Sequence, residues 1–226
     1  MHWGSASSRD LLHWEAGDIA LFPDRDGTMF SGSGWRDDEN AAGFGPGALL
    51  FYYTCAGGTQ APWSRDGVFT QRLAVSVDGG RTLEKQPGLL LPNLVHDNRD
   101  PKVFRHEASG AYIMTLYLAG NDYAIFRSPD LIHWEQTQQL TLPEAWECPD
   151  LFPLTVEGRK MGFLVRRQLL FCGDRLTAGA SLRSSRAERP TPTGSATRRK
   201  PLPARRAASS RWRGFACRTP EDVSRA

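Results

Sequence analysis

Two acidic residues lie in segments that place a carboxylate just before a proline and an aromatic strand. Asp100 belongs to Asn-Arg-Asp-Pro-Lys-Val-Phe (98–104), and Glu147 belongs to Trp-Glu-Cys-Pro-Asp-Leu-Phe (146–152). A single carboxylate is more often a solvated surface charge or a turn cap than a functional group. Two such loops, each continuing into an apolar strand, are better explained as a site on a rigid scaffold. Carboxylates can transfer protons and stabilise positive charge, so these two are the candidate chemical groups.

The segments that must position these loops are predicted to be short β-strands. They are rich in β-branched and aromatic residues and are separated by turn residues such as Asp78-Gly-Gly and Glu157-Gly. The predicted strands are residues 48–54, 72–77, 111–118, 123–126 and 161–165. No stretch keeps apolar residues at helical spacing for three turns. The predicted fold class is therefore all-β.

A weak internal repeat indicates how the strands are arranged. Residues 8–15 and 128–135 match at seven of eight positions when Leu and Ile count as one, and residues 76–84 resemble both with one insertion. A recurring Ser-x-Asp turn followed by Trp suits radially repeated blades, in which each blade needs the same hairpin and the same packed aromatic. We therefore expect a β-propeller. A β-sandwich with a chance duplication is the alternative.

Charge divides the chain at about Arg166. Residues 1–166 hold 14 Lys and Arg against 21 Asp and Glu, a balance of −7, whereas residues 167–226 hold 14 against 4, a balance of +10. The second part also lacks any apolar period that could build a core. It is predicted to be a disordered basic tail, and its Arg, Ala, Ser and Pro content favours an out-of-frame origin. An arginine-rich arm for nucleic acid is the alternative, and we expect no nucleic-acid partner.

The remaining composition is that of an ordinary globular protein. Of the 226 residues, 40% are hydrophobic and 23% charged, which excludes collagen and disulfide scaffolds. The longest apolar run is residues 48–53, far below the roughly 20 residues of a spanning helix, and residues 1–4 show no signal-peptide pattern. The sequence thus predicts no membrane association. Four separated cysteines, without a C-x-x-C pair, are predicted to be thiols, and neither a metal nor a cofactor is expected; the cysteines are Cys55, Cys148, Cys172 and Cys217.

Five segments, in order, resemble motifs of glycoside hydrolase family 32, which contains invertases, levanases and inulinases. These segments are residues 1–6, 8–15, 30–33, 99–104 and 147–152. The resemblance implies a five-bladed β-propeller whose funnel binds a terminal β-fructofuranosyl unit of sucrose or a fructan and hydrolyses it with retention. Residues 1–166 are expected to form a partial domain of this family. Five blades need on the order of 300 residues, so about three blades are expected.

The resemblance also implies roles for individual residues. Glu147 matches the general acid/base, and its neighbours Trp146, Cys148 and Pro149 are expected to supply apolar surroundings that raise its pKa. Asp100 matches the transition-state stabiliser, and Arg99 is expected to donate to the sugar or to Glu147. The other positions expected to contact substrate are Trp3, Phe30, Ser31 and Asp150.

Two departures from the family pattern change the expected activity. The family nucleophile is an Asp in a motif resembling W-M-N-D-P-N-G that lies before the His-Trp-Gly segment, and the only Asp-Pro of this sequence is Asp100-Pro101. The nucleophile is therefore absent, and we expect an inactive fragment of a β-fructosidase. A non-catalytic fructan-binding pseudoenzyme is the alternative. In addition, Ser5 stands where the family usually has His. Sucrose, inulin and levan all stay open as substrates.

Overall fold

The structure is a computed structural model that describes residues 1–58, 62–65, 67–107, 109–156, 159–166, 169–173, 185–186 and 212–218. These residues form fifteen strands and one short 3-10 turn, η1 (Pro62–Ser64). Within them no helix is long and apolar enough to cross a membrane. The all-β prediction is confirmed.

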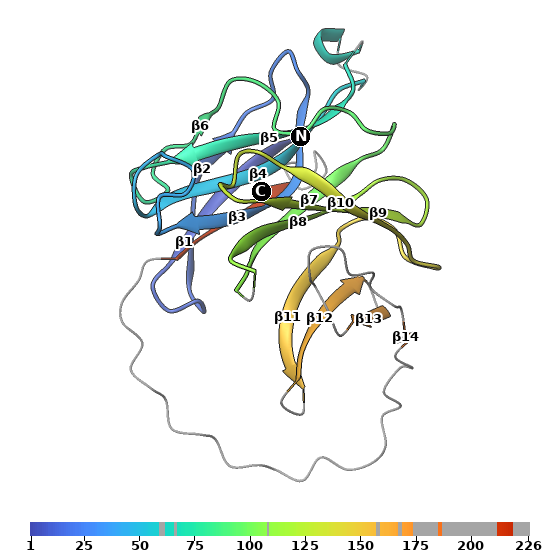
Figure 1. The fold of residues 1–226 in the computed structure, drawn as a ribbon. Helices are drawn as coiled ribbons and strands as arrows, with labels where there is room; N and C mark the ends of the chain where they lie inside the picture. The colour runs from blue at the N-terminus through green and yellow to red at the C-terminus, as the bar shows by residue number, and fades with distance from the viewer. Residues whose placement is uncertain are drawn as a thin grey trace, which may run out of the picture.

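Three of the sheets are four-stranded meanders in which neighbouring strands follow one another along the chain (Figure 1). The first contains β3 (Thr28–Asp37), β4 (Ala48–Ala56), β5 (Phe69–Ser76) and β6 (Glu84–Lys85). The second contains β7 (Arg99–His106), β8 (Ala111–Tyr117), β9 (Asp122–Ser128) and β10 (Glu135–Thr141). The third contains β11 (Asp150–Val156), β12 (Arg159–Arg166), β13 (Leu169–Gly173) and β14 (Ser185–Arg186).

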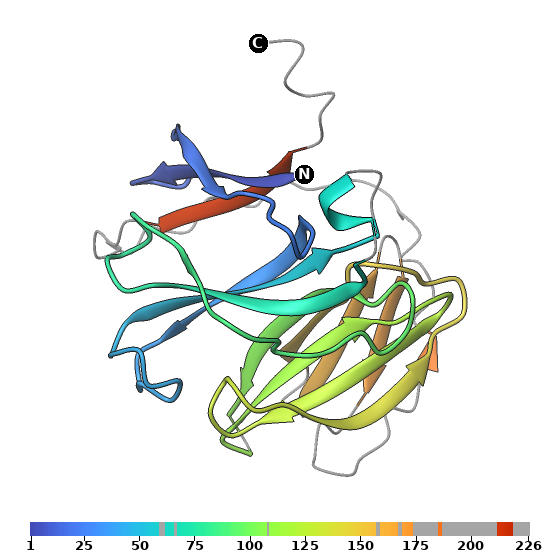
Figure 2. The same ribbon diagram turned by 90° about the horizontal axis from the view of Figure 1, so that it is seen from above.

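A fourth sheet has three strands in the order β15-β1-β2, namely β15 (Trp212–Arg218), β1 (His2–Ser8) and β2 (Trp14–Leu21). The sheets stand side by side (Figure 2), and the first strand of each meander contacts the first strand of the next, β3 with β7 and β7 with β11. The backbone N–H of Val103 on β7 donates to Ser33 Oγ on β3 at 3.0 Å. Repeated meanders whose first strands adjoin are the blades of a β-propeller.

The core fills the spaces between successive sheets. Alternate residues of a strand face opposite sides, so a central strand between two sheets is apolar on both faces. On β4, Leu50 and Tyr52 pack toward the sheet of β7–β10, whereas Phe51 and Tyr53 pack with Trp3 toward the sheet of β1 and β2. This double burial explains the unbroken apolar run in residues 48–53.

The repeated Ser-x-Asp segment forms the same turn each time. In the β9–β10 turn, Ser128 Oγ accepts from the backbone N–H of Leu131 at 2.8 Å, and Asp130 Oδ1 accepts from those of Ile132 and His133 at 3.0 and 2.8 Å. Ser8 and Asp10 make the equivalent contacts between β1 and β2. Ser76 and Asp78 cap the longer β5–β6 turn. β5–β6 and β9–β10 are the last hairpins of their sheets, and β1–β2, at one end of the sheet β15-β1-β2, carries the same turn.

The described parts of the predicted tail differ from the expectation of disorder. Strands β13, β14 and β15 all lie after Arg166. β13 pairs with β12, and β15 pairs with β1 over seven residue pairs. A reason for this pairing is that an open strand edge presents unsatisfied backbone groups, which any extended segment can satisfy. The other residues of 167–226 lie outside the described residues, and for them disorder and an out-of-frame origin stay predictions.

Candidate active site

The candidate residues lie where the strands depart from regular pairing. The pairing register shifts between Trp3 and Gly4 on β1 and between Met29 and Gly32 on β3, which places Phe30 and Ser31 in the irregular segment. On β7 it shifts between Arg99 and Lys102, around Asp100 and Pro101. Bulges bend a strand and redirect its side chains, and they are frequent next to active sites.

Asp100 is held by two hydrogen bonds, one to strand β4 and one from the loop before β11. Its backbone N–H donates to Thr54 Oγ1 on β4 at 3.0 Å, and its carboxylate Oδ2 accepts from the backbone N–H of Cys148 at 2.8 Å. The residue is 8% exposed. Its φ of +62° is unusual for a non-glycine residue, and a residue before proline normally prefers an extended backbone. The two hydrogen bonds therefore fix a strained conformation.

Glu147 lies opposite, in the loop before β11. Glu147 and Cys148 both have positive φ, +56° and +39°. Arg99 Nη2 donates to Glu147 Oε1 at 2.8 Å, and the guanidinium lies 4.6 Å from the ring centre of Tyr117. Partial burial disfavours the charged guanidinium, but the hydrogen bond and negative charge of Glu147 outweigh this and raise the pKa of Arg99. The expected contact between Arg99 and Glu147 is present.

The surroundings of Glu147 differ from the apolar enclosure that the sequence predicts. Its side chain is 38% exposed, and Trp146 is half-exposed. A cation, Arg99, contacts the carboxylate, because the first residue of β7 comes close to the loop before β11. The loops that carry Asp100 and Glu147 are thus joined by two contacts, from Cys148 N–H to the Asp100 carboxylate and from Arg99 to the Glu147 carboxylate.

The other predicted contact residues divide into two groups. Trp3 Nε1 donates to the backbone carbonyl of Phe30 at 2.8 Å, so these two lie together, and Ser31 is exposed beside them. Trp3 is itself buried, with edge-on contacts to Phe51 and Tyr53, so its ring forms part of the hydrophobic core. The Asp150 carboxylate pairs with Lys102 Nζ at 3.0 Å.

Sequence reasoning missed several residues of this neighbourhood. Lys102 follows Asp100 in the same motif, and its charge was a usable signal. Thr54 and Gln71 are fully buried polar residues within otherwise apolar strands, a placement that usually requires a specific hydrogen-bond partner. Tyr117 and Tyr123 gave no signal beyond being strand residues.

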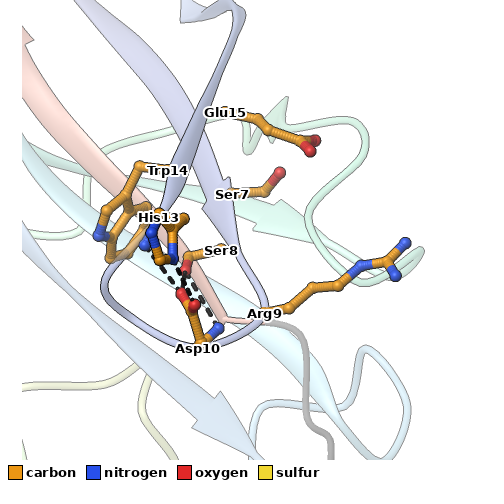
Figure 3. Close-up of a pocket in the computed structure, with 7 residues that line it drawn as sticks. All are labelled: Ser7, Ser8, Arg9, Asp10, His13, Trp14 and Glu15. Carbon is orange, nitrogen blue, oxygen red and sulfur yellow. Dashed lines mark hydrogen bonds and ion pairs between the residues drawn. The ribbon is translucent and has the colours of Figure 1, made fainter.

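A surface pocket lies elsewhere, at the β1–β2 hairpin (Figure 3). Its lining residues are Ser7, Ser8, Arg9, Asp10, His13, Trp14 and Glu15. The Asp10 carboxylate and the His13 ring are already paired at 2.6 Å. The pocket shares no residue with the candidate active site. In the part of the chain that the structure describes, no group of three His, Cys, Asp or Glu residues could hold a metal ion.

The fold and the two joined loops define a β-propeller whose candidate site lies where adjacent blades meet. The Glycosyl hydrolases family 32 N-terminal domain matches residues 1–185, and the chain belongs to this family. The match continues past Arg166, the predicted domain boundary.

Similar proteins agree with this family. A levanase of Bacillus subtilis is 40% identical over 168 residues, which is 70% of this chain and 24% of the levanase. An extracellular exo-inulinase of Meyerozyma guilliermondii is 34% identical over 172 residues, which is 70% of this chain and 32% of that protein. The structure of a fructofuranosidase from Schwanniomyces occidentalis, complexed with fructose, aligns at 27% identity with a TM-score of 0.67, covering 83% of this chain and 40% of that one. The chain therefore spans about a quarter to two fifths of these proteins.

Proposed function

We propose that this chain supplies part of the active site of a retaining β-fructosidase that acts on terminal β-fructofuranosyl units of sucrose or fructans. The observation that carries the proposal is the meeting of two loops 48 residues apart in sequence, through the Arg99–Glu147 and Cys148–Asp100 hydrogen bonds. The relatives named as levanase, exo-inulinase and fructofuranosidase support the substrate class.

In the proposed mechanism, Glu147 protonates the glycosidic oxygen as the bond to the leaving group breaks. The exposure of its side chain gives the carboxyl access to substrate and water. The same residue then acts as the base that activates water in the second half of a retaining reaction. Arg99 orients this carboxyl by a charged hydrogen bond.

Asp100 is proposed to stabilise the positive charge that develops on the fructose ring. One carboxylate oxygen, Oδ2, is engaged by Cys148 N–H, which fixes the orientation of the group before substrate arrives. A preorganised negative charge in a largely buried position acts more strongly on a developing cation than one in water. Trp3, Phe30, Ser31 and Asp150 are proposed to shape the surrounding pocket.

Retention also requires a carboxylate nucleophile, and the family motif that would provide it is absent from these 226 residues. We therefore propose that the chain alone does not turn over substrate. Because Asp100 and Arg99 remain positioned without a nucleophile, fructan binding without hydrolysis is the second candidate function.

The test measures fructose release from sucrose, inulin and levan by the 226-residue chain, and retention of the chain on immobilised inulin. The expected result is no fructose release by the chain alone. Retention that Asp100→Asn abolishes, and that the exposed β10 control Glu135→Gln keeps, supports a fructose site. Rapid fructose release by the chain alone would show that another carboxylate acts as nucleophile.

A further inference from the structure

Three fully buried polar residues form a chain of hydrogen bonds that ends at Asp100. Thr54 on β4 and Gln71 on β5 stand directly opposite in the strand pairing. Thr54 Oγ1 donates to Gln71 Oε1 at 2.7 Å, and Gln71 Nε2 donates to the backbone carbonyl of Asn98 at 3.0 Å. All three residues have 0% exposure.

The directions of these hydrogen bonds are fixed by chemistry. The carbonyl of Asn98 can only accept, so it must face the NH2 group of Gln71, which turns the amide oxygen toward Thr54. That oxygen accepts the hydrogen bond from the Thr54 hydroxyl. The hydroxyl oxygen then has its lone pairs free to accept the backbone N–H of Asp100. Each member of the network therefore holds one orientation.

The same network holds the loop that leads into Asp100. The backbone of Gln71 exchanges hydrogen bonds with Leu91, and Asn98 Oδ1 accepts from the backbone N–H groups of Leu94 and Val95 at 2.9 and 3.2 Å. The loop before β7 is thus attached to β5 at both of its ends. A strained backbone persists only where its surroundings overdetermine it, and here they do so on the N-terminal side of Asp100.

We propose that Thr54 and Gln71 are positioning residues for the Asp100 carboxylate. They hold the N–H of Asp100 so that its Oδ2 meets Cys148 N–H, which in turn sets the place of the Glu147 loop. The catalytic role of this positioning rests on the proposed function, but the positioning of Asp100 by Thr54 and Gln71 can be tested separately.

The test measures amide hydrogen exchange in the full chain by NMR, with Thr54→Val as the main variant. Valine keeps the volume of threonine but removes the hydroxyl. We expect the amides of Asp100 and Cys148 to exchange about tenfold faster, because the Asp100 N–H loses its acceptor and the Asp100 carboxylate that accepts from Cys148 is then no longer held in place. Thr54→Ser retains the hydroxyl and should restore slow exchange.

The matched control is Thr115→Val on β8. Thr115 is also fully buried, and its hydroxyl has no hydrogen-bond partner among the described residues, so the same substitution removes no contact. We expect the Asp100 and Cys148 amides to be unchanged in this control. Unchanged exchange at Cys148 in Thr54→Val, or equal acceleration in Thr115→Val, would overturn the proposal.

A second variant covers the case in which Thr54→Val also loosens the neighbouring sheet β7–β10, as faster exchange at Met114 on β8 would reveal. Gln71→Met leaves the Thr54 hydroxyl in place but unaligned, and it should accelerate Asp100 and Cys148 while Met114 stays slow. Acceleration at all three amides in this variant would mean that the network stabilises the core in general and does not specifically position Asp100, which would overturn the proposal.

Titration with fructose separates this inference from the proposed function. If the unmodified chain binds fructose, Thr54→Val should weaken the affinity about tenfold and Thr54→Ser should restore it. If the unmodified chain binds no fructose, the second candidate function, fructan binding by this chain, fails, while the exchange result at Cys148 still decides whether Thr54 and Gln71 position Asp100.

Discussion

Three non-glycine residues with positive φ gather at the candidate site: Asp100, Glu147 and Cys148. A left-handed backbone costs an L-residue about 1–2 kcal/mol, and these three belong to two loops that touch each other. Backbone strain of this kind clusters at functional sites, where a side chain must be held in a specific orientation. Positive φ also occurs in the hairpin turns, at Leu11 and Leu131, so the gathering of three such residues in two touching loops supports the proposed site without defining it.

Glu147→Gln tests the acid role in a chain extended to carry the missing nucleophile segment. We expect fructose release from sucrose to fall about 10²- to 10⁴-fold, because the glucose oxygen leaves poorly without a proton. An aryl fructofuranoside with an acidic phenol should lose much less. Comparison of kcat for the two substrates is the measurement. Equal losses for both would exclude Glu147 as the acid.

Thiol alkylation tests the environments of two cysteines. Cys55 is buried, which raises the pKa of its thiol to about 11, whereas Cys148 is exposed, and neither is in a disulfide. The thiolate is the reactive form, so iodoacetamide at pH 8 should modify Cys148 well before Cys55. Peptide mass spectrometry distinguishes the sites. Modification of Cys55 at the same rate would contradict the packing of β4.

The sequence allowed the two carboxylates and the Arg99–Glu147 contact to be predicted, because each lies in a recognisable segment. It did not allow Thr54 and Gln71 to be predicted, since their role depends on strand register, which is set by partners far away in the chain. The apolar enclosure expected for Glu147 is not found, because its side chain is 38% exposed and Arg99 contacts its carboxylate.

The hairpin turns of this chain are repeated elements, like the strands that they join. In the β9–β10 turn, Leu131 is 0% exposed and Tyr52 OH donates to its carbonyl at 3.1 Å. In the β1–β2 turn, the corresponding Leu11 is 55% exposed. Both leucines have positive φ, +69° and +66°. The turn therefore keeps its conformation whether or not a neighbouring sheet covers it.

The pH dependence of stability should reveal the Asp130 cap. Partial burial opposes ionisation, but hydrogen bonds from His133 and Ile132 outweigh it and hold the pKa of Asp130 at about 2. A lowered folded-state pKa stabilises the protein above the unfolded value near 3.9, and this contribution is lost as the pH falls toward 2. The stability difference between the unmodified chain and Asp130→Asn should therefore shrink between about pH 4 and 2.

Urea unfolding at several pH values is the measurement, and Asp122→Asn, on β9, is the comparison variant. A difference that stays constant from pH 7 to pH 2 would mean that the Asp130 carboxylate does not act through its charge.

Strand positions near the middle of the chain were predictable from β-branched and aromatic residues, and the Ser-x-Asp repeat indicated radially repeated blades. The order β15-β1-β2 was not, because nothing in residues 212–218 specifies β1 as a partner. An edge strand accepts any extended segment, so such pairing carries little sequence information.

The division of charge between residues 1–166 and 167–226 gives a prediction for the chain as a unit. Brief digestion with proteinase K should cut within 167–226 before it cuts β8, because a segment without an apolar period that could build a core protects its backbone poorly. Mass spectrometry of the first fragments identifies the sites. A protease of broad specificity is needed because the segment is rich in Arg. Equal protection of both parts would contradict the out-of-frame interpretation.

The Ser-x-Asp turn also has a consequence for how this chain folds. Its hydrogen bonds join residues two to four positions apart, and in the β1–β2 copy they form without cover from another sheet. Contacts this local close quickly and need no distant partner. During synthesis, the β1–β2, β5–β6 and β9–β10 hairpins can therefore form as soon as they leave the ribosome, before the next sheet has been translated. Such hairpins present free strand edges on which the following strands can then assemble.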